Sequence, residues 1–171
     1  MPLYFQLDEF YLTALQLNFV PYQDGVPRKV QSNIDYDIKS FNNNELQFRM
    51  DFKVGVREFK ENLEPAGMSL DCIMVGFFTI SEELEAEKRE VTARVNGVQM
   101  LYGALRGIVM NLTATLPGGK RLLPGIDPVD AVNFIESEKA RKNQQAPDPQ
   151  ASKEKTAPVK KRVRKVSRVR R

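Results

Sequence analysis

The hydrophobic residues between positions 46 and 57 alternate strictly with polar ones. Every even position from Leu46 to Val56 is apolar, and every odd position is polar or glycine. A period of two with one apolar face is typical of a half-buried antiparallel strand. The pattern therefore predicts a strand over 46–57 that places its apolar face on a core.

Three further segments follow a similar pattern and predict strands over 13–20, 33–39 and 68–80. The asparagines at 42–44 predict a turn between the second and third of the four strands. In the last strand the alternation weakens before Gly76, which predicts a bend or bulge there. Strands that follow one another without intervening helices favour an antiparallel sheet.

After the strands the apolar spacing changes to three and four residues. Ser81 is a predicted N-cap for a short charged helix that ends near Arg94, and Asn96-Gly97 is expected to interrupt it. A long helix is predicted over 98–116, and a last helix begins at Pro128 with Asp127 as its cap. The expected fold class is α+β: a four-stranded antiparallel sheet followed by a long helix and a second C-terminal helix.

Charge divides the chain into two regions. Residues 1–138 carry thirteen Lys/Arg against twenty acids, whereas residues 139–171 carry thirteen Lys/Arg against two acids. From 143 onward the hydrophobic residues are only Ala and Val, too few to bury a core. We therefore expect one domain over 1–142 and a disordered basic tail over 143–171.

Composition also limits the chemistry. The chain has no His and a single Cys72, so the usual zinc sites and His-dependent catalysis are excluded. Cys72 lies inside an apolar strand and is expected to be a small buried hydrophobe. There is no signal-peptide pattern and no apolar run long enough to span a membrane. These features predict a soluble cytoplasmic protein that is not an enzyme and needs no cofactor or metal.

Three motifs in a fixed order resemble those of the SecB family of protein-export chaperones. They are Gly76-Phe77-Phe78 at the end of the last strand, Asn96 followed by Leu101-Tyr102-Gly103-Ala104-Leu105-Arg106, and Leu122-Leu123-Pro124-Gly125-Ile126 before the final helix. The resemblance covers about residues 10–138. It implies an ATP-independent holdase that binds unfolded polypeptides or preproteins, and an assembly that is a dimer of dimers.

The resemblance also implies where the functional residues lie. A groove between the sheet and the helical layer would bind the client through Phe48, Phe52, Phe77, Phe78, Met100 and Leu123. Ordinary core packing is the competing interpretation for each of these residues. The oligomer interface would be formed by the long helix, through Leu101, Gly103, Ala104, Gly107 and Ile108.

Departures from the family pattern bear on the partners. Gly103 and Ala104 replace a proline and an aromatic residue of the helix-opening motif. Asp71 matches one acid of the face that meets the SecA motor, but Gln16 and Val20 stand where acids are usual. The SecA partner is therefore uncertain, and two alternatives remain: a dedicated antitoxin chaperone of a toxin–antitoxin system, or an adaptor that acts through its tail.

The end of the tail is the candidate for binding a polyanion. Its cations are Lys160, Lys161, Arg162, Arg164, Lys165, Arg168, Arg170 and Arg171. Without aromatic residues the segment would contact nucleic-acid phosphates independently of sequence. An anionic membrane surface, an acidic client or partner, the acidic domain of the same chain, and a purely solubilising role are the other interpretations.

Overall fold

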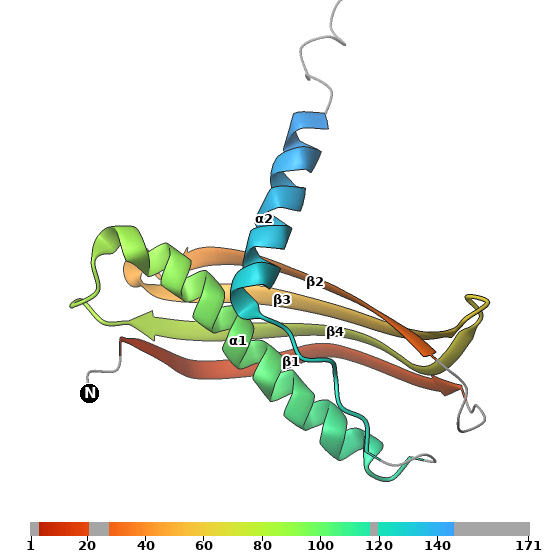
Figure 1. Cartoon of the computed structure of the whole chain (residues 1–171). Helices are drawn as coiled ribbons and strands as arrows, with labels where there is room; N and C mark the ends of the chain where they lie inside the picture. Colours follow the sequence, from red (N-terminus) through yellow and green to blue (C-terminus); the bar gives the residue numbers. More distant parts are fainter. Residues whose placement is uncertain (1–3, 21–27, 117–119, 146–171) are drawn as a thin grey trace, which may run out of the picture.

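The computed structural model describes residues 4–20, 28–116 and 120–145, and the side chains of these residues up to 142. Within them, one antiparallel sheet is formed by β1 (Phe5–Val20), β2 (Arg28–Phe41), β3 (Asn44–Lys60) and β4 (Pro65–Ile80). The strand order is β1-β4-β3-β2, so β1 and β2 are the two edges. Both helices, α1 (Ala86–Thr113) and α2 (Pro128–Gln145), lie on the same face of the sheet (Figure 1). The α+β prediction is confirmed.

Strand β1 is twice the length predicted for it because two irregularities hide its period. Register shifts fall between Leu7 and Glu9 and between Leu12 and Ala14. Each shift inserts one unpaired residue into β1, so the face to which odd-numbered residues point changes at each shift. As a result Leu7, Leu12 and Leu15 all stand opposite even-numbered residues of β4. β4 carries no bulge at Gly76, where it pairs with β3 in unbroken register; the extra residues lie on β1, on either side of the Phe10–Gly76 pair.

The turn between β2 and β3 agrees with its asparagines. Asn42 and Asn43 both have positive φ, 56° and 53°. A two-residue hairpin turn of this kind needs positive φ at both central residues, and asparagine tolerates it better than most residues do.

Helix α1 is longer than predicted and is not interrupted. It runs from Ala86 through Gly97, whereas a break was expected at Asn96-Gly97. Gly97 packs closely on the sheet: a Cβ there would lie 2.7 Å from Cε of Met50, so the end of that side chain would have to shift. Ser81 does not cap the helix, and its hydroxyl accepts a hydrogen bond from the Glu83 N–H in the turn before it.

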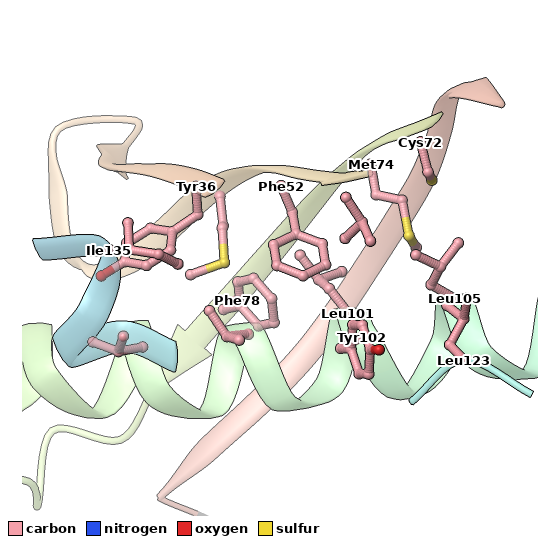
Figure 2. Packing of buried hydrophobic residues seen from close by; sticks show 14 of the residues in the cluster. Tyr36, Phe52, Cys72, Met74, Phe78, Leu101, Tyr102, Leu105, Leu123 and Ile135 are labelled. Atoms are coloured by element: carbon pink, nitrogen blue, oxygen red, sulfur yellow. The ribbon is translucent and has the colours of Figure 1, made fainter. Parts of the chain in front are cut away.

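The core lies between α1 and the sheet (Figure 2). Met50 and Phe52 of β3, Met74 of β4 and Leu101 and Leu105 of α1 are completely buried. Gly76 lets α1 approach β4, since a Cβ there would lie 2.9 Å from Leu101 Cδ2 and from the Phe78 ring. Cys72 is buried as predicted, and burial raises the pKa of its thiol to about 11.

The connector between the helices, residues 120–127, is held against α1. Tyr102 donates a hydrogen bond of 2.7 Å to the Pro124 carbonyl, and the Thr113 hydroxyl accepts one of 2.9 Å from the Arg121 N–H. The connector then ends in the predicted cap: Asp127 Oδ1 accepts hydrogen bonds from the Val129 and Asp130 N–H groups. The connector therefore fixes where α2 begins, above the edge of the sheet.

Candidate functional site

A groove runs between strand β2 and helix α2, at the edge of the sheet. One part of it is a cavity of about 280 Å³ with Ile34 of β2, Ile126 of the connector and Phe134 and Ile135 of α2 in its walls. A second cavity of about 390 Å³ shares Asn33, Ile34, Phe134 and Ile135 and continues along α2 to Lys142. We call the two together the β2–α2 groove.

The walls of this groove come from three segments that the fold brings together. Ile135 is almost completely buried beneath α2, and Ile34 is half-buried beside it. Phe134 precedes Ile135 on the helix and is 65% exposed. An exposed phenylalanine beside a half-buried floor gives the groove apolar surface that a partner can cover.

Strand β2 gives the groove a backbone edge as well as side chains. The Tyr36 N–H donates to Oδ1 of Asp35, and the Tyr36 carbonyl accepts from Nζ of Lys139, so both Tyr36 groups face away from β3. Because alternate residues of an antiparallel strand share one direction, the N–H and C=O groups of Ser32 and Ile34 face the same edge. An extended peptide can pair with such groups.

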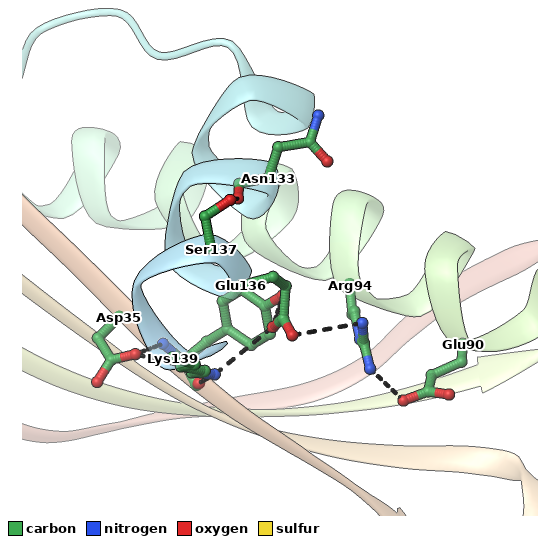
Figure 3. A network of polar contacts seen from close by, with 8 residues as sticks. Asp35, Glu90, Arg94, Asn133, Glu136, Ser137 and Lys139 are labelled. Carbon is green, nitrogen blue, oxygen red and sulfur yellow. Dashed lines mark hydrogen bonds and ion pairs between the residues drawn. The ribbon is translucent and has the colours of Figure 1, made fainter. Parts of the chain in front are cut away.

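A polar network attaches α2 to the rest of the fold (Figure 3). Tyr36 donates a hydrogen bond of 2.7 Å to Glu136 Oε1, and Arg94 of α1 lies 3.6 Å from Glu136 Oε2. Arg94 also pairs with Glu90. The Lys139 ammonium lies 3.7 Å from Glu136 and 4.3 Å from the centre of the Tyr36 ring. Three elements, β2, α1 and α2, thus meet at Glu136.

Burial dominates the protonation of Tyr36. Its side chain is nearly inaccessible, and burial, then the hydrogen bond to Glu136, raises the pKa of its hydroxyl well above the usual value. The neutral phenol is therefore the form that the network holds.

The groove carries more acids than bases. Asp127 and Asp130 line its first part without any cation. Asp35 and Glu138 line its second part together with Lys139 and Lys142. Lys139 is already engaged with Tyr36, Glu136 and Asp35. The rim is therefore acidic above an apolar floor.

Of the predicted client-binding residues, Phe48, Phe77 and Phe78 line one cavity of about 360 Å³ beside the β2–β3 turn, and the other three lie apart from it. Phe48, Phe52, Phe78 and Leu123 are buried in the core, which Figure 2 shows for the last three. Phe77 is on the opposite face of the sheet, where its ring contacts Tyr11 and Phe41. Met100 is 38% exposed on α1. Four of the six residues thus pack in this chain's own core, and two of these, Phe48 and Phe78, also line the cavity beside Phe77.

The predicted interface residues divide in the same way. Leu101 is completely buried against the sheet. Gly103 and Gly107 lie on the outer side of α1, where a Cβ would meet nothing within 4 Å. Ala104 and Ile108 are half-buried between these two sides. The remaining four residues are thus accessible on one side of α1, and Leu101 is not.

The β2–α2 groove is not predicted from the sequence. The strand predicted over 33–39 contains Ile34 and the helix predicted from Pro128 contains Phe134 and Ile135, but no local pattern places them together. The signal that was available was the pair of adjacent apolar residues on a short helix, because only one of them can face its own core. The predicted polyanion-binding residues, 160–171, lie outside the described residues.

Comparisons with known proteins bear on the fold. No protein-family model matches the chain, and no curated protein matches it. Among solved structures, the chain is similar to the Mycobacterium tuberculosis Rv1957 SecB-like chaperone, in complex with a ChAD peptide from the Rv1956 HigA1 antitoxin. The two share 16% identity with a TM-score of 0.56, over 71% of this chain and 90% of that one. The fold is SecB-like.

A protein of unknown function from Streptococcus agalactiae is also similar, with a TM-score of 0.46 and 8% identity over 71% of this chain and 97% of that one. Among the described residues, neither helix is long and apolar enough to cross a membrane.

Proposed function

We propose that this protein is an ATP-independent chaperone that holds unfolded polypeptide in the β2–α2 groove. The observation that carries the proposal is the coincidence of an apolar groove with the free edge of a long strand. The SecB-like fold supports the same function. An unfolded client offers both things that such a site recognises: apolar side chains and unpaired backbone groups.

Two kinds of interaction would contribute to binding. Client side chains that cover Ile34, Phe134 and Ile135 remove apolar surface from water, at roughly 25 cal/mol per Å² before the cost of ordering the client. The edge groups of Ser32 and Ile34 would hydrogen-bond the client backbone whatever its sequence. Affinity without strong sequence preference is what a holdase requires.

The client-binding residues proposed from the structure differ from those predicted from the sequence. Ile34, Ile126, Phe134 and Ile135 line the β2–α2 groove, whereas Phe48, Phe77 and Phe78 line a separate cavity beside the β2–β3 turn. Phe52 and Leu123 reach a client only if the core opens. Phe77 and Met100 remain candidates for separate contacts because both are accessible.

The test is light scattering of an aggregating unfolded protein in the presence of the full chain. The wild-type chain should suppress aggregation near stoichiometrically, and Phe134→Asp should weaken suppression about tenfold because it places a charge in the apolar groove. Val129→Asp is the matched control, because Val129 is also exposed on α2 but does not line the groove. Equal loss in both variants, or none in either, would contradict the proposal.

A dedicated antitoxin client is the second candidate. The M. tuberculosis neighbour was solved with an antitoxin peptide, which supports this narrower function for the present chain. A toxin–antitoxin gene pair beside its gene would supply the test peptide. Saturable binding of that antitoxin's peptide, with no suppression of general aggregation, would favour the dedicated function over the general one. Service in protein export would require SecA binding, for which Asp71 on the outer sheet face is the matching acid.

We also propose that copies of the chain associate through the outer side of α1, as a dimer of dimers. Gly103 and Gly107 leave that side open, so a second helix can approach closely. Gly107→Glu should reduce the mass measured by light scattering after gel filtration, whereas Gly107→Ala should keep it. An unchanged mass for Gly107→Glu would exclude this surface.

A further inference from the structure

The β2–α2 groove has two features that a segment of the same chain complements. Its floor is apolar and its rim is acidic, through Asp35, Asp127, Asp130 and Glu138. The segment 159–171 carries eight cations and no acid, with valines at 159, 163, 166 and 169. Both the charge and the apolar residues of the segment are complementary to the groove.

We propose that this segment docks in the β2–α2 groove of its own chain as a pseudo-client and competes with unfolded polypeptide. The inference rests on the proposed function, because it names the regulation of the same groove. Among the partners that the composition of the tail allows, the proposal chooses the acidic domain of the same chain.

The pattern of the segment fits an added strand. In an extended chain, alternate residues point to opposite faces. The odd positions carry Val159, Val163 and Val169 together with three cations, whereas the even positions carry five cations, at 160, 162, 164, 168 and 170, and a single valine. One face of such a strand is therefore enriched in valine and the other is almost entirely basic.

Strand β2 has the matching asymmetry. Ile34, Tyr36 and Ile38 pair with the helix-facing residues of β3, and Asp35 and Asp37 with residues of its other face. A strand added beside β2 continues this division, because neighbouring residues across a ladder share a face. The valines would then lie over the groove floor, with Lys161, Lys165 and Arg171 of the same face toward Asp127, Asp130 and Glu138. The other five cations would lie beside Asp35 and Asp37.

The connection is long enough for this arrangement. Lys142 already lines the groove, and α2 ends at Gln145. The thirteen residues 146–158 span up to about 45 Å when extended. A tethered segment also acts at an effective concentration that can reach millimolar, so weak intrinsic affinity is sufficient.

Another acidic region of the molecule is less suitable. Glu82, Glu83, Glu85, Glu87 and Glu90 lie before and within the first turns of α1. The cavity beside them also contains Lys39 and Arg89. Its lining also includes Ile38 and Phe48, so it differs from the groove in charge: two cations balance Glu45 and Glu90 there.

The test uses isoleucine methyl NMR spectra of three full-length chains: wild type, a variant with the eight cations changed to Gln, and a variant with Val159, Val163 and Val169 changed to Ser. The methyl signals of Ile34, Ile126 and Ile135 report on the groove, and that of Ile80, buried at the far end of β4, is the control. Docking predicts that both variants shift the groove signals and leave Ile80 in place. High salt should move the wild-type groove signals toward those of the Gln variant.

The affinity for an unfolded polypeptide is measured on the same chains. Removing a competing segment should tighten the binding about threefold or more in both variants. If the groove signals shift but no chain binds polypeptide, the docking stands and the proposed function fails. If all chains suppress aggregation but the groove signals coincide, the function stands and the docking is overturned. Binding of duplex DNA with a steep salt dependence, with unshifted groove signals, would also overturn it and assign the tail to polyanions.

Discussion

The two helices lie on the same face of the sheet but are held there in different ways. Helix α1 places eight buried residues along its length, among them Leu101, Leu105 and Val109. Helix α2 places two buried apolar residues on the fold, Val132 and Ile135, and otherwise relies on Asp127 and the network around Glu136. Figure 1 shows α1 along the sheet and α2 extending away from it.

Because of this difference, we expect α1 to have a fixed position and α2 to move more easily. A helix held by close packing has one position, because interiors tolerate little change in volume. A helix held by a few apolar residues and exposed polar contacts can shift or detach at lower cost. The groove lies between β2 and α2, so its width depends on the more weakly held helix, which suits a site that accepts many polypeptides.

The largest expected effect is on the free energy of unfolding, when one buried residue of each helix is replaced by alanine. Leu105→Ala should lower the free energy of unfolding by about 3 kcal/mol, because it leaves a cavity beneath α1. Ile135→Ala should cost less, about 1–2 kcal/mol, since the open groove lets its surroundings relax. Urea unfolding followed by circular dichroism measures both.

Exposed neighbours provide the controls for this pair. Leu112→Ala on α1 and Val129→Ala on α2 remove side chains that are about half exposed and should change stability by less than about 0.5 kcal/mol. If Ile135→Ala cost as much as Leu105→Ala, α2 would be as much a part of the core as α1, and the distinction would fail.

The same contrast explains what the sequence could predict. Strand β3 and helix α1 bury regular stripes of residues, and their periods of two and 3.6 were visible. The break predicted at Gly97 is wrong because this glycine packs against Met50, a residue of another element, which local sequence does not reveal. The groove was missed because Ile34, Ile126 and Ile135 come from three segments with no shared local pattern.

The network at Glu136 gives the next effect. Tyr36→Phe removes the hydrogen bond to a carboxylate and should cost about 1–2 kcal/mol at pH 8. The pKa of Tyr36 is raised on folding, so its neutral form stabilises the fold fully below about pH 10 and progressively less above it. Wild type should therefore lose stability faster than Tyr36→Phe between pH 9.5 and 11.

Urea unfolding of both proteins at several pH values measures this difference. The two proteins differ only at position 36, so the contributions of all other groups cancel in the comparison. Parallel pH profiles would mean that Tyr36 does not link α2 to β2 as described. Hydrogen exchange should in addition become faster in α2 than in α1 in the variant.

The helix cap tests α2 on its own. Asp127→Ala removes the acceptor for two N–H groups and should cost about 1 kcal/mol, located in α2. Asp127→Asn keeps the cap and should restore most of that loss. Amide exchange in α2, compared with that in α1, distinguishes local fraying from global destabilisation; equal acceleration in both helices would contradict the view that α2 moves independently.

The smallest expected effect concerns the outer face of the sheet, away from both helices. Arg57 and Asp71 form an ion pair of 2.5 Å between β3 and β4, and both side chains are exposed. Such pairs contribute little in water, so Asp71→Asn should change the free energy of unfolding by about 0.5 kcal/mol or less. Asp71 is also the residue for which the family resemblance implies a role in binding the SecA motor. A pull-down of SecA by wild type that Asp71→Asn abolishes, at unchanged stability, would indicate that this face binds a partner while the β2–α2 groove binds the client; equal recovery of SecA by both proteins would remove Asp71 from that role.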